Sequence, residues 1–478
     1  MYSPVASKTT HYTLFALAVQ FGLYLWCLDV SKAFMLGPID KPGLFMRPPT
    51  GFRTETHPDY CPFGQYTTYE LLCSLYGLKQ AAAVYYDTMK RLLLEYVFPD
   101  GSSFRLSPAD PCLFIRGSLE DSSSPYVAIS THVDDKFIAC RRPQDRDLVA
   151  SIFSGAQWKF TLRLMDEVLG VHIKYQRWDP SLGHRGSLEA DHRQYLTDAY
   201  NKYASLLPAD RRGSCHNIPI SSSLVAQLTA CGPTSWEAYD KERHSRYRSV
   251  LGTLSHVANF THPEIAFAIS FASQFMQNPS EAHLDMVLGI LLYAYGTRDK
   301  VICFQRQLCP PGVSPIMIAC DSDLSNSSNR RSRTGFCAYL YGMLVAWHSR
   351  LQPSVSLSTA EAEYMAIAAA SRFAVWCRML VGDLGVQRCY RDPVHVFSDN
   401  KSAICIANNP ITHKHSRHID RRLHWLREQC LGGTIKVVFI ATNDNVSDVM
   451  TKALKRDAFR KHRTSLLTGY HFTEQIKG

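Results

Sequence analysis

Two adjacent carboxylates, Asp134 and Asp135, lie between two short apolar runs, residues 126–129 and 137–140. Apolar runs on both sides of a short polar pair predict a β-hairpin with the two acids at its tip. Neighbouring like charges repel each other at such a tip, and a divalent cation relieves that repulsion. Taken alone, the pair is better explained as an ordinary turn, because Asp is a common turn residue.

A third acid, Asp29, occurs far upstream in the same local setting, at the end of the apolar run 23–28. Three carboxylates on two strand ends can hold two metal ions, which activate a hydroxyl and stabilise a leaving pyrophosphate. Mg²⁺ suits a site made only of oxygen ligands. The sequence therefore predicts metal-assisted phosphoryl transfer, with Asp29, Asp134 and Asp135 as both catalytic and metal-binding residues.

Five motifs accompany these acids in a fixed order. They are residues 28–37, 45–52, 74–80, 110–114 and the 133–135 hairpin. In this order they resemble the reverse transcriptase of copia-type retrotransposon polyproteins, and the resemblance continues over nearly the whole chain. It implies a polymerase palm that copies RNA or DNA templates into DNA. The implied partners are an RNA template, a DNA primer and deoxynucleoside triphosphates (dNTPs).

The resemblance also implies substrate-binding roles for four residues around the palm. Phe34 would face the incoming sugar, with a core aromatic on the palm as an equal alternative. Gly77 would let the backbone approach a ligand closely. Lys79 would contact a phosphate, against the alternative of a solvated lysine. His132, where the family commonly has Tyr, would stack on the primer strand or donate a hydrogen bond to it.

Three departures from the family pattern bear on polymerase activity. The upstream basic stretch of the fingers, which grips the triphosphate, is missing, so we expect incomplete fingers. Ala82 and Ala83 replace the usual Pro and Arg, which removes a fork-shaped phosphate ligand. Lys136 occupies a usually apolar position beside the metal acids, where it is expected to pair with one of them and compete with the cation.

A second set of acids occurs in the C-terminal half of the chain. Asp321 and Asp399 each end an apolar strand-like run, and Glu363 and Asp448 lie near the starts of predicted helices. This series of elements resembles the ribonuclease H domain of the same polyproteins. The resemblance implies that the four acids hold two Mg²⁺ ions, which activate water for attack on an RNA phosphate. Each acid alone also fits a helix cap or a turn, but four in these elements favour the site.

Neighbouring groups are weaker candidates for ligands. Asp323 shares the strand parity of the first acid and is a second choice, whereas Glu361 lies on a different helix face from Glu363. The histidines between positions 413 and 424 do not have the spacing of an ordinary zinc site. His418 belongs to a family motif near the nuclease site, where a role in binding substrate phosphate and a structural role at a helix start both remain open.

Composition and length are consistent with a multidomain, nucleic-acid-binding protein. A chain of 478 residues suggests two to four domains, and its net charge of +10 suits a polyanionic partner. The 15 scattered cysteines fit the reduced thiols of an intracellular protein, in the cytoplasm, the nucleus or both. The apolar segment 14–28 is short and interrupted for a membrane span, so we expect no membrane partner and a buried helix before the first palm strand.

The predicted fold class is a multidomain combination of α+β and α/β domains. Residues 1–175 are expected to form a reverse transcriptase palm with incomplete fingers, 176–310 a helical thumb, linker and connection, 311–456 a ribonuclease H-like mixed-sheet domain, and 457–478 a solvated basic tail. The predicted connection helix 282–297 has apolar residues where related sequences tend to carry Lys or Arg. Those basic residues would follow a nucleic-acid backbone.

Two functions follow from these patterns. The first is an RNA-directed DNA polymerase with ribonuclease H activity on RNA–DNA hybrids, using two Mg²⁺ ions in each active site. The alternative is a catalytically weak or dead relic that at most binds nucleic acid, including a form whose nuclease works and whose polymerase does not. The departures favour the alternative, and the presence of all seven acids favours the enzyme. The sequence leaves the oligomeric state open.

Overall fold

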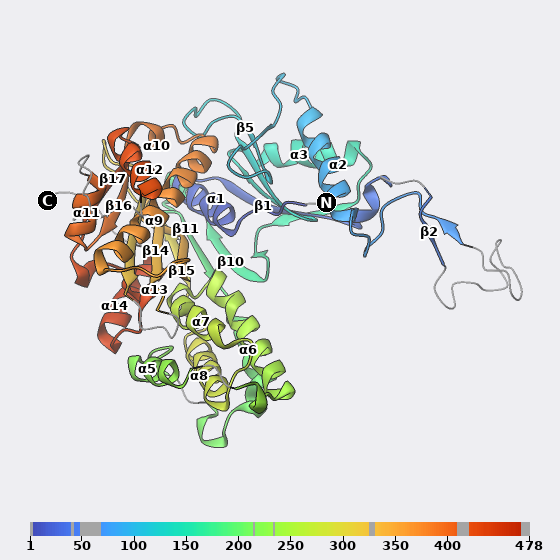
Figure 1. Ribbon diagram of the computed structural model, residues 1–478. Helices are drawn as coiled ribbons and strands as arrows, with labels where there is room; N and C mark the ends of the chain where they lie inside the picture. The colour runs from blue at the N-terminus through green and yellow to red at the C-terminus, as the bar shows by residue number, and fades with distance from the viewer. Residues whose placement is uncertain are drawn as a thin grey trace, which may run out of the picture. The chain divides into compact units, whose positions relative to one another are not determined.

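The computed structural model describes residues 3–39, 43–47, 68–213, 216–232, 235–324, 330–408 and 420–469 (Figure 1). The chain divides into two compact units. Unit 1 comprises Met1–Ser7 and Tyr24–Leu164, and unit 2 comprises Lys8–Leu23 and Met165–Gly478. The fold is mixed α/β and multidomain, as the sequence predicts. The finer boundaries at 175, 310 and 456 stay a prediction.

Unit 1 is built on a six-stranded sheet with the strand order β4-β5-β6-β7-β1-β8, in which all neighbours are antiparallel. Its strands are β1 (Tyr24–Val30), β4 (Arg105–Leu106), β5 (Leu113–Arg116), β6 (Val127–His132), β7 (Asp135–Cys140) and β8 (Phe160–Leu164). The other elements are η1 (Ala33–Leu36), the pair β2 (Phe45–Met46) and β3 (Tyr69–Glu70), α2 (Ala81–Glu95) and α3 (Pro143–Gly155). Most of the segment between β2 and β3 lies outside the described residues, so the incomplete fingers stay a prediction.

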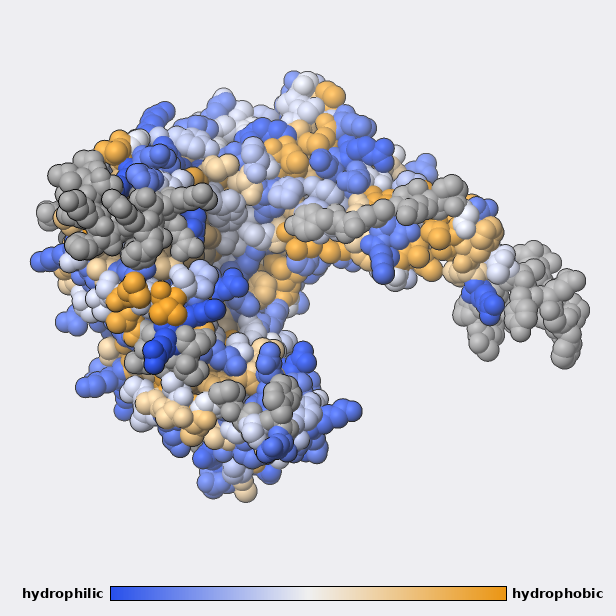
Figure 2. All heavy atoms as spheres, in the orientation of Figure 1, coloured by the Kyte–Doolittle hydropathy of each residue, from blue (hydrophilic) through white to orange (hydrophobic). Residues whose placement is uncertain are grey.

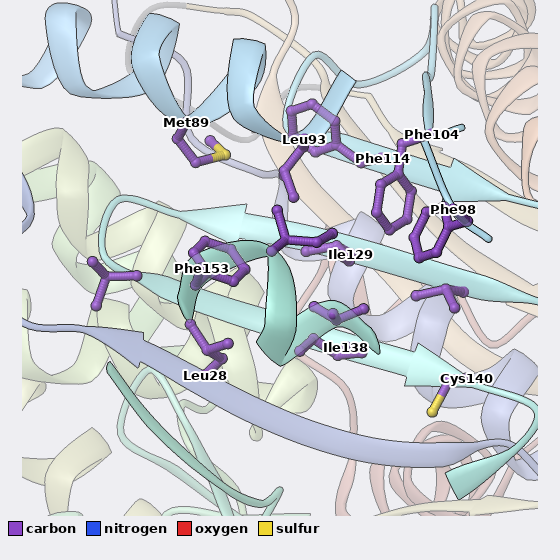
Figure 3. Close-up of a cluster of buried hydrophobic side chains, with 14 of the residues drawn as sticks. Leu28, Met89, Leu93, Phe98, Phe104, Phe114, Ile129, Ile138, Cys140 and Phe153 are labelled. Carbon is purple, nitrogen blue, oxygen red and sulfur yellow. The ribbon is translucent and has the colours of Figure 1, made fainter. Parts of the chain in front are cut away.

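The hydrophobic core of unit 1 lies on the face of this sheet that α2 and α3 cover. Leu28 of β1 and Ile138 of β7 belong to the same buried cluster as Phe153 of α3 (Figure 3). Complete burial of such a side chain contributes about 1.5–3 kcal/mol. Because strand side chains alternate between faces, Asp29 and Asp135 project from the opposite face of the sheet. The core therefore fixes the register of the strands that carry these acids.

Unit 2 begins with α1 (Lys8–Phe21), which is the buried helix predicted before the first strand. The Tyr12 hydroxyl donates a hydrogen bond to Phe260 O, and its ring lies edge-on to Trp347 at 5.7 Å between centroids. A four-stranded antiparallel sheet follows, in the order β12-β11-β10-β9. Its strands are β9 (Glu167–Val168), β10 (Val171–Gln176), β11 (Ser187–Asp191) and β12 (Ile302–Gln305). Although α1 precedes the strands of unit 1 in sequence, it groups with unit 2.

A helical region connects β11 to β12. Its helices are α4 (Arg193–Tyr203), α5 (Ser222–Cys231), α6 (Lys241–Phe260), α7 (Ala266–Ala272) and α8 (Glu281–Gly296). The predicted connection helix is α8, in which Leu288 and Leu292 are 2% and 1% exposed. Tyr295 stacks on Tyr200 at 4.0 Å between centroids. The apolar residues at positions where related sequences tend to be basic are therefore packed inside the helical region.

The last part of unit 2 contains a five-stranded mixed sheet in the order β15-β14-β13-β16-β17, so the predicted mixed-sheet domain is present. Its strands are β13 (Ile316–Asp323), β14 (Arg333–Leu340), β15 (Met343–Leu351), β16 (Val394–Ser398) and β17 (Ile435–Phe439). The first three pair antiparallel, and β16 pairs parallel with β13 and β17. The helices are α9 (Thr359–Asp383), α10 (Arg388–Arg391), α11 (Lys401–Asn408), α12 (Asp420–Leu431), α13 (Asp448–Thr451) and α14 (Arg456–Thr468).

The long helix α9 packs against this sheet (Figure 1). Its N-cap is Ser358, whose hydroxyl accepts a hydrogen bond from Glu361 N at 3.1 Å. By length and composition alone α9 could cross a membrane, with a mean hydropathy of 1.3, but 61% of its apolar window is buried inside the protein. That burial is typical of a core helix. Hydrophilic residues cover much of the visible face of the molecule, with apolar residues scattered between them (Figure 2).

The prediction of a solvated basic tail is wrong for residues 457–468. These residues belong to α14, in which Phe459, His462 and Leu466 are buried on one side. The Phe459 ring packs edge-on to Tyr293 at 5.8 Å between centroids. Several basic side chains, such as Arg460 and Lys461, stay exposed on the other side. The i, i+3, i+7 spacing of the buried residues makes one helix face apolar, and the many basic residues between them concealed that pattern.

Candidate active sites

The pairing of β1 with β7 brings two of the predicted polymerase acids together. Asp29 is the register partner of Asp135, and Asp134 lies in the two-residue turn between β6 and β7. The turn is held against β1 by a hydrogen bond from Val30 N to Asp134 O at 3.1 Å. The predicted hairpin is therefore present, with its acids at the tip. Burial, followed by the charges of Asp134 and Asp29, raises the pKa of Asp135.

The hairpin turn itself is strained. Val133 has a φ of 56°, a region that β-branched residues rarely adopt. A two-residue hairpin turn requires positive φ at its first central residue, so the pairing of β6 with β7 imposes this conformation. Such strain costs about 1–3 kcal/mol and is frequent at functional sites.

Lys136 lies beneath this turn, on the face of β7 that the helices cover. Its side chain is fully buried, and Nζ donates hydrogen bonds to Tyr85 Oη at 3.1 Å and to Val133 O at 2.7 Å. Burial lowers the pKa of Lys136 to about 7. Parity places Lys136 with Ile138, away from Asp135. The structure thus gives Lys136 a hydroxyl and a carbonyl as partners, in place of the predicted carboxylate.

Phe34 lies on η1 and is half-buried. Its ring centroid is 4.8 Å from that of Tyr76 and 6.3 Å from that of Tyr85. It also packs against the core cluster of unit 1. These contacts support the alternative that Phe34 is a core aromatic. Its role in facing the sugar stays a prediction.

The other predicted substrate-binding residues of unit 1 differ in their surroundings. Gly77 is exposed, and its φ of 99° is a conformation that favours glycine. Lys79 is exposed in the same loop, three residues before Ala82 in α2. His132 is half-buried at the end of β6, where it is the register partner of Asp135. His132 is therefore the predicted substrate-binding residue that lies beside the acids in the sheet register.

The mixed sheet of unit 2 brings the second set of acids together. Asp321 in β13, Asp399 directly after β16 and Asp448 at the start of α13 offer carboxylate oxygens that all lie within 4.8 Å of one another. They converge because β13 and β16 are parallel neighbours, so residues at their carboxyl ends meet at one edge of the sheet. Among the residues that the structure describes, Asp29, Asp134 and Asp135 do not form so close a group.

Glu363 approaches the second set from the first turns of α9. Its Oε1 accepts a hydrogen bond from Ser322 N at 3.3 Å, so it lies against the strand that carries Asp321. Glu363 Oε2 is buried and has no hydrogen-bond partner within the described part of the chain. Burial, then Asp321 and Asp399, raises the pKa of Glu363 to about 9. Burial, then Asp321, raises the pKa of Asp448 to about 7.

These four acids, which we call the unit 2 acid cluster, fit a divalent cation. Converging carboxylates repel one another, and the charged forms of Glu363 and Asp448 are disfavoured by burial and by Asp321. A cation relieves this repulsion, and oxygen ligands of this kind suit Mg²⁺. The unpartnered oxygen of Glu363 offers a further ligand atom. The triad Asp321, Asp399 and Asp448 is thus consistent with a metal site.

Lys452 contacts this cluster, and the sequence analysis did not identify it as part of the site. Its Nζ lies 3.1 Å from Asp448 Oδ1 and 3.6 Å from Asp321 Oδ2. The hydroxyl of Thr451 donates a hydrogen bond to Asp321 Oδ2. The signal was present in the spacing, because residues 448 and 452 are four apart and lie on one face of a helical turn.

Gly335 allows α13 to approach the sheet. It is the register partner of Asp321 in the β13–β14 pair. A Cβ at this position would lie 2.6 Å from Met450 Cβ and 2.7 Å from Thr451 Cγ2. A larger residue would therefore push away the turn that carries Asp448.

The sequence also offered His418, Asp323 and Glu361 as candidates at or near the nuclease site, and the structure treats them differently. His418 lies outside the described residues. Asp323 ends β13, and burial raises its pKa. The Glu361 carboxylate accepts a hydrogen bond from Leu357 N at 2.7 Å, so it stabilises the start of α9.

Comparison with known proteins adds a family to this geometry. Residues 1–176 match the family described as reverse transcriptase (RNA-dependent DNA polymerase). The chain is 28% identical over 464 residues to the retrovirus-related Pol polyprotein from transposon TNT 1-94 of Nicotiana tabacum, an alignment that covers 96% of this chain and 32% of that protein.

Two further relatives extend the similarity beyond one polyprotein. Identity is 28% over 470 residues to the retrovirus-related Pol polyprotein from transposon RE1 of Arabidopsis thaliana, covering 97% of this chain and 29% of that protein. Identity is 25% over 476 residues to the transposon Ty1-ER2 Gag-Pol polyprotein of Saccharomyces cerevisiae, covering 96% and 25%. The chain therefore spans about a third or less of the length of these curated relatives.

Proposed function

From the premise that this chain corresponds to the reverse-transcriptase-containing region of copia/Ty1-type retrotransposon Pol polyproteins, we propose that it synthesises DNA on RNA and DNA templates and cleaves RNA in RNA–DNA hybrids. Residues 1–176 carry the reverse transcriptase (RNA-dependent DNA polymerase) domain. Hybrid cleavage is proposed for a ribonuclease H-like domain on the mixed sheet of unit 2. An intracellular location, in the cytoplasm or the nucleus, is part of this proposal.

The main support for the proposed nuclease activity is the convergence of Asp321, Asp399 and Asp448, with Glu363 beside them. When bound, Mg²⁺ held by these four acids would supply activation of the attacking water and stabilisation of the leaving oxygen at the phosphate. The protein keeps the acids in place through hydrogen bonds from Thr451 to Asp321 and from Ser322 N to Glu363. His418 is proposed to contact a substrate phosphate.

For the polymerase, Asp29, Asp134 and Asp135 are proposed to hold the corresponding pair of Mg²⁺ ions. His132, at the end of the strand beside these acids, would contact the primer strand. Phe34 would face the sugar of the incoming dNTP, and Gly77 and Lys79 would lie under the template and the nascent base pair.

The second candidate function is a chain whose nuclease works and whose polymerase is weak or dead. Two observations favour it. The acids of unit 1 do not form as close a group as the unit 2 acid cluster, within the part of the chain that the structure describes. Lys136 also buries an ammonium directly beneath the hairpin turn, where related sequences are apolar.

One experiment separates these possibilities. The full chain is tested with Mg²⁺ for primer extension on an RNA template and for cleavage of a labelled RNA–DNA hybrid. Asp134→Asn is expected to lose extension and keep cleavage, and Asp399→Asn is expected to lose cleavage and keep extension, so each variant is the control for the other. Cleavage without extension in the unaltered chain would support the second candidate. A chain that binds hybrid and performs neither reaction would be a catalytically dead relic.

A further inference from the structure

A basic cavity of about 710 Å³ lies beside the unit 2 acid cluster. Its walls come from α7 and the turn after it, from the end of β15, and from α9. Three arginines line it, Arg331, Arg350 and Arg372, and none of its described lining residues is acidic. The proposed chemistry uses none of these residues.

Two of the arginines are available to a ligand. Arg350 and Arg372 are both exposed. Neither has a carboxylate within ion-pair distance among the residues that the structure describes. Like charges that line one cavity repel each other, and an anion relieves that repulsion. Guanidinium groups also present a planar fork of donors, which matches the oxygens of a phosphate.

Neutral donors complete the lining. Gln274 Nε2 is buried and has no hydrogen-bond partner within the described residues. The pKa of His348 is lowered to about 4 by burial and then by the charges of Arg350 and Lys8, so its ring is neutral near pH 7. The described lining contains no Phe, Tyr or Trp on which a base could stack. The cavity therefore offers donors for an anion and, in its described lining, no Phe, Tyr or Trp for a nucleobase.

Gln352 connects this cavity to the acid cluster. It is 2% exposed, and its Nε2 donates to Thr334 Oγ1 at 3.1 Å and to Ala362 O at 2.9 Å. Ala362 directly precedes Glu363, and Thr334 lies on the strand that pairs with β13. The cavity thus adjoins both the strand pair and the helix that position the acids.

We propose that this cavity binds backbone phosphates of the nucleic-acid strand that passes the unit 2 acid cluster. Arg350 and Arg372 are the ligands, and Gln274 is a neutral donor. A polynucleotide backbone is favoured over a free nucleotide because the described lining has three arginines and no Phe, Tyr or Trp on which a base could stack. This inference rests on the proposed function, since it assumes that the acid cluster acts on a polynucleotide.

The test measures binding apart from cleavage. Binding of a fluorescently labelled RNA–DNA hybrid to the full chain is followed by anisotropy in EDTA at several salt concentrations. Arg350→Ala with Arg372→Ala is expected to weaken binding about tenfold and to lower the slope of log K against log salt by about 1–2, because each phosphate contact contributes about 0.9 to that slope. Arg460→Ala, an exposed arginine on α14 outside the cavity, is the matched control and should behave as the unaltered chain does.

Conservative variants sharpen the result. Arg350→Lys with Arg372→Lys keeps the charge and loses the fork, so it is expected to retain most of the salt slope with weaker binding. A double-alanine variant that matches Arg460→Ala in both affinity and slope would overturn the proposal. A second result would also overturn the proposal. If inorganic pyrophosphate raises the melting temperature of the unaltered chain but not of the double-alanine variant, and both bind hybrid equally well, the cavity is a site for small anions.

Failure of the nuclease is distinguishable from failure of this inference. The Asp399→Asn comparison in Mg²⁺ reports on cleavage alone. A chain that never cleaves hybrid, yet binds it in EDTA through Arg350 and Arg372, would refute the nuclease and support the cavity as a phosphate site.

Discussion

Each set of acids has a lysine near it, and the two lysines differ in their environment. Lys452 points between two carboxylates of unit 2, at 3.1 and 3.6 Å, and its side chain is 34% exposed. Lys136 is fully buried under the acids of unit 1 and bonds to a hydroxyl and a carbonyl. The first lysine therefore supplies charge to its acids directly, whereas the second adds an ammonium to a hydrophobic core.

Replacing Lys452 should change how the unit 2 acid cluster binds a cation. Lys452→Met removes the positive charge between Asp321 and Asp448, so the chain without metal should lose about 1–2 kcal/mol of stability. Mg²⁺ and Mn²⁺ should then bind severalfold more tightly, because no ammonium competes for the same oxygens. Calorimetric melting with and without each metal measures both effects.

The control is Lys461→Met, which removes a lysine paired with the exposed Asp444 at 2.7 Å. An exposed pair contributes little, so this variant should melt as the unaltered chain does. A metal-induced rise in melting temperature that is equal in Lys452→Met and the unaltered chain would contradict competition by the lysine.

Replacing Lys136 should stabilise unit 1. Lys136→Met keeps the length of the side chain and removes a buried ammonium, and this gain exceeds the loss of the hydrogen bonds to Tyr85 and Val133. We expect about 1–2 kcal/mol of added stability at pH 7. Hydrogen exchange of β6 and β7 in urea measures it, with exposed Lys159→Met as the control. Unchanged or faster exchange in Lys136→Met would show that the two hydrogen bonds outweigh the burial of the charge.

At the scale of elements, local patterns predicted the scaffold and missed several of its contacts. Three features have a short-range signal in period or residue type. They are the hairpin of Asp134 and Asp135, the apolar strands that carry Asp321 or directly precede Asp399, and the cap of α9. The contacts that were missed join elements far apart in sequence. Phe459 of α14 is buried by Tyr293, and Tyr12 of α1 bonds to Phe260, and no local pattern records such partners.

The same limit explains the connection helix. Related sequences tend to have basic residues at several positions of this helix, and the apolar residues found here were noted as a loss of charge. The structure shows that Leu288 and Leu292 are core residues of α8. Period and composition could not reveal which elements cover the helix. Only the fold of the region around α8 decides that question.

A substitution in α8 tests whether this burial matters. Leu288→Lys introduces a basic residue at a position that is 2% exposed, so it should destabilise the chain by more than about 3 kcal/mol. Asp285→Lys, on the exposed side of the same helix, should change stability by about 0.5 kcal/mol or less. Thermal melting compares the two. If Leu288→Lys keeps its stability and binds hybrid more tightly, α8 is a nucleic-acid surface after all.

At the scale of the whole molecule, each set of acids is carried by its own sheet, and the two sheets belong to different compact units. Titratable groups of unit 2 act on its stability in opposite senses as the pH falls. Several buried histidines of unit 2 have a lowered pKa because of burial, namely His192, His262, His283, His348 and His462. In the same unit, Glu363 and Asp448 have a raised pKa, which acts in the opposite sense on stability. The effect of one histidine is therefore best measured as a difference between variants.

His283 is the histidine whose acid response can be isolated. It is 1% exposed at the start of α8, its Nδ1 accepts a hydrogen bond from Ser280 N at 2.9 Å, and its ring stacks on Phe275. Burial lowers its pKa to about 4, against an ordinary value of 6.5. Below pH 6.5 the unfolded chain takes up a proton that the folded chain refuses, so stability is lost as the pH falls from 6.5 towards 4. Over that window the loss approaches about 3 kcal/mol.

His283→Gln should remove this loss, because glutamine at the same helical position can accept the bond from Ser280 N without titrating. At pH 7 the variant should be about 1 kcal/mol less stable, since the stacking on Phe275 is lost. Between pH 6.5 and 4 its stability should fall less steeply than that of the unaltered chain, so the two curves should cross. Urea unfolding at each pH measures this, with His172→Gln on the exposed surface of β10 as the control. Parallel curves for His283→Gln and the unaltered chain would mean that His283 takes up its proton in the folded state, and that the start of α8 opens before the unit unfolds.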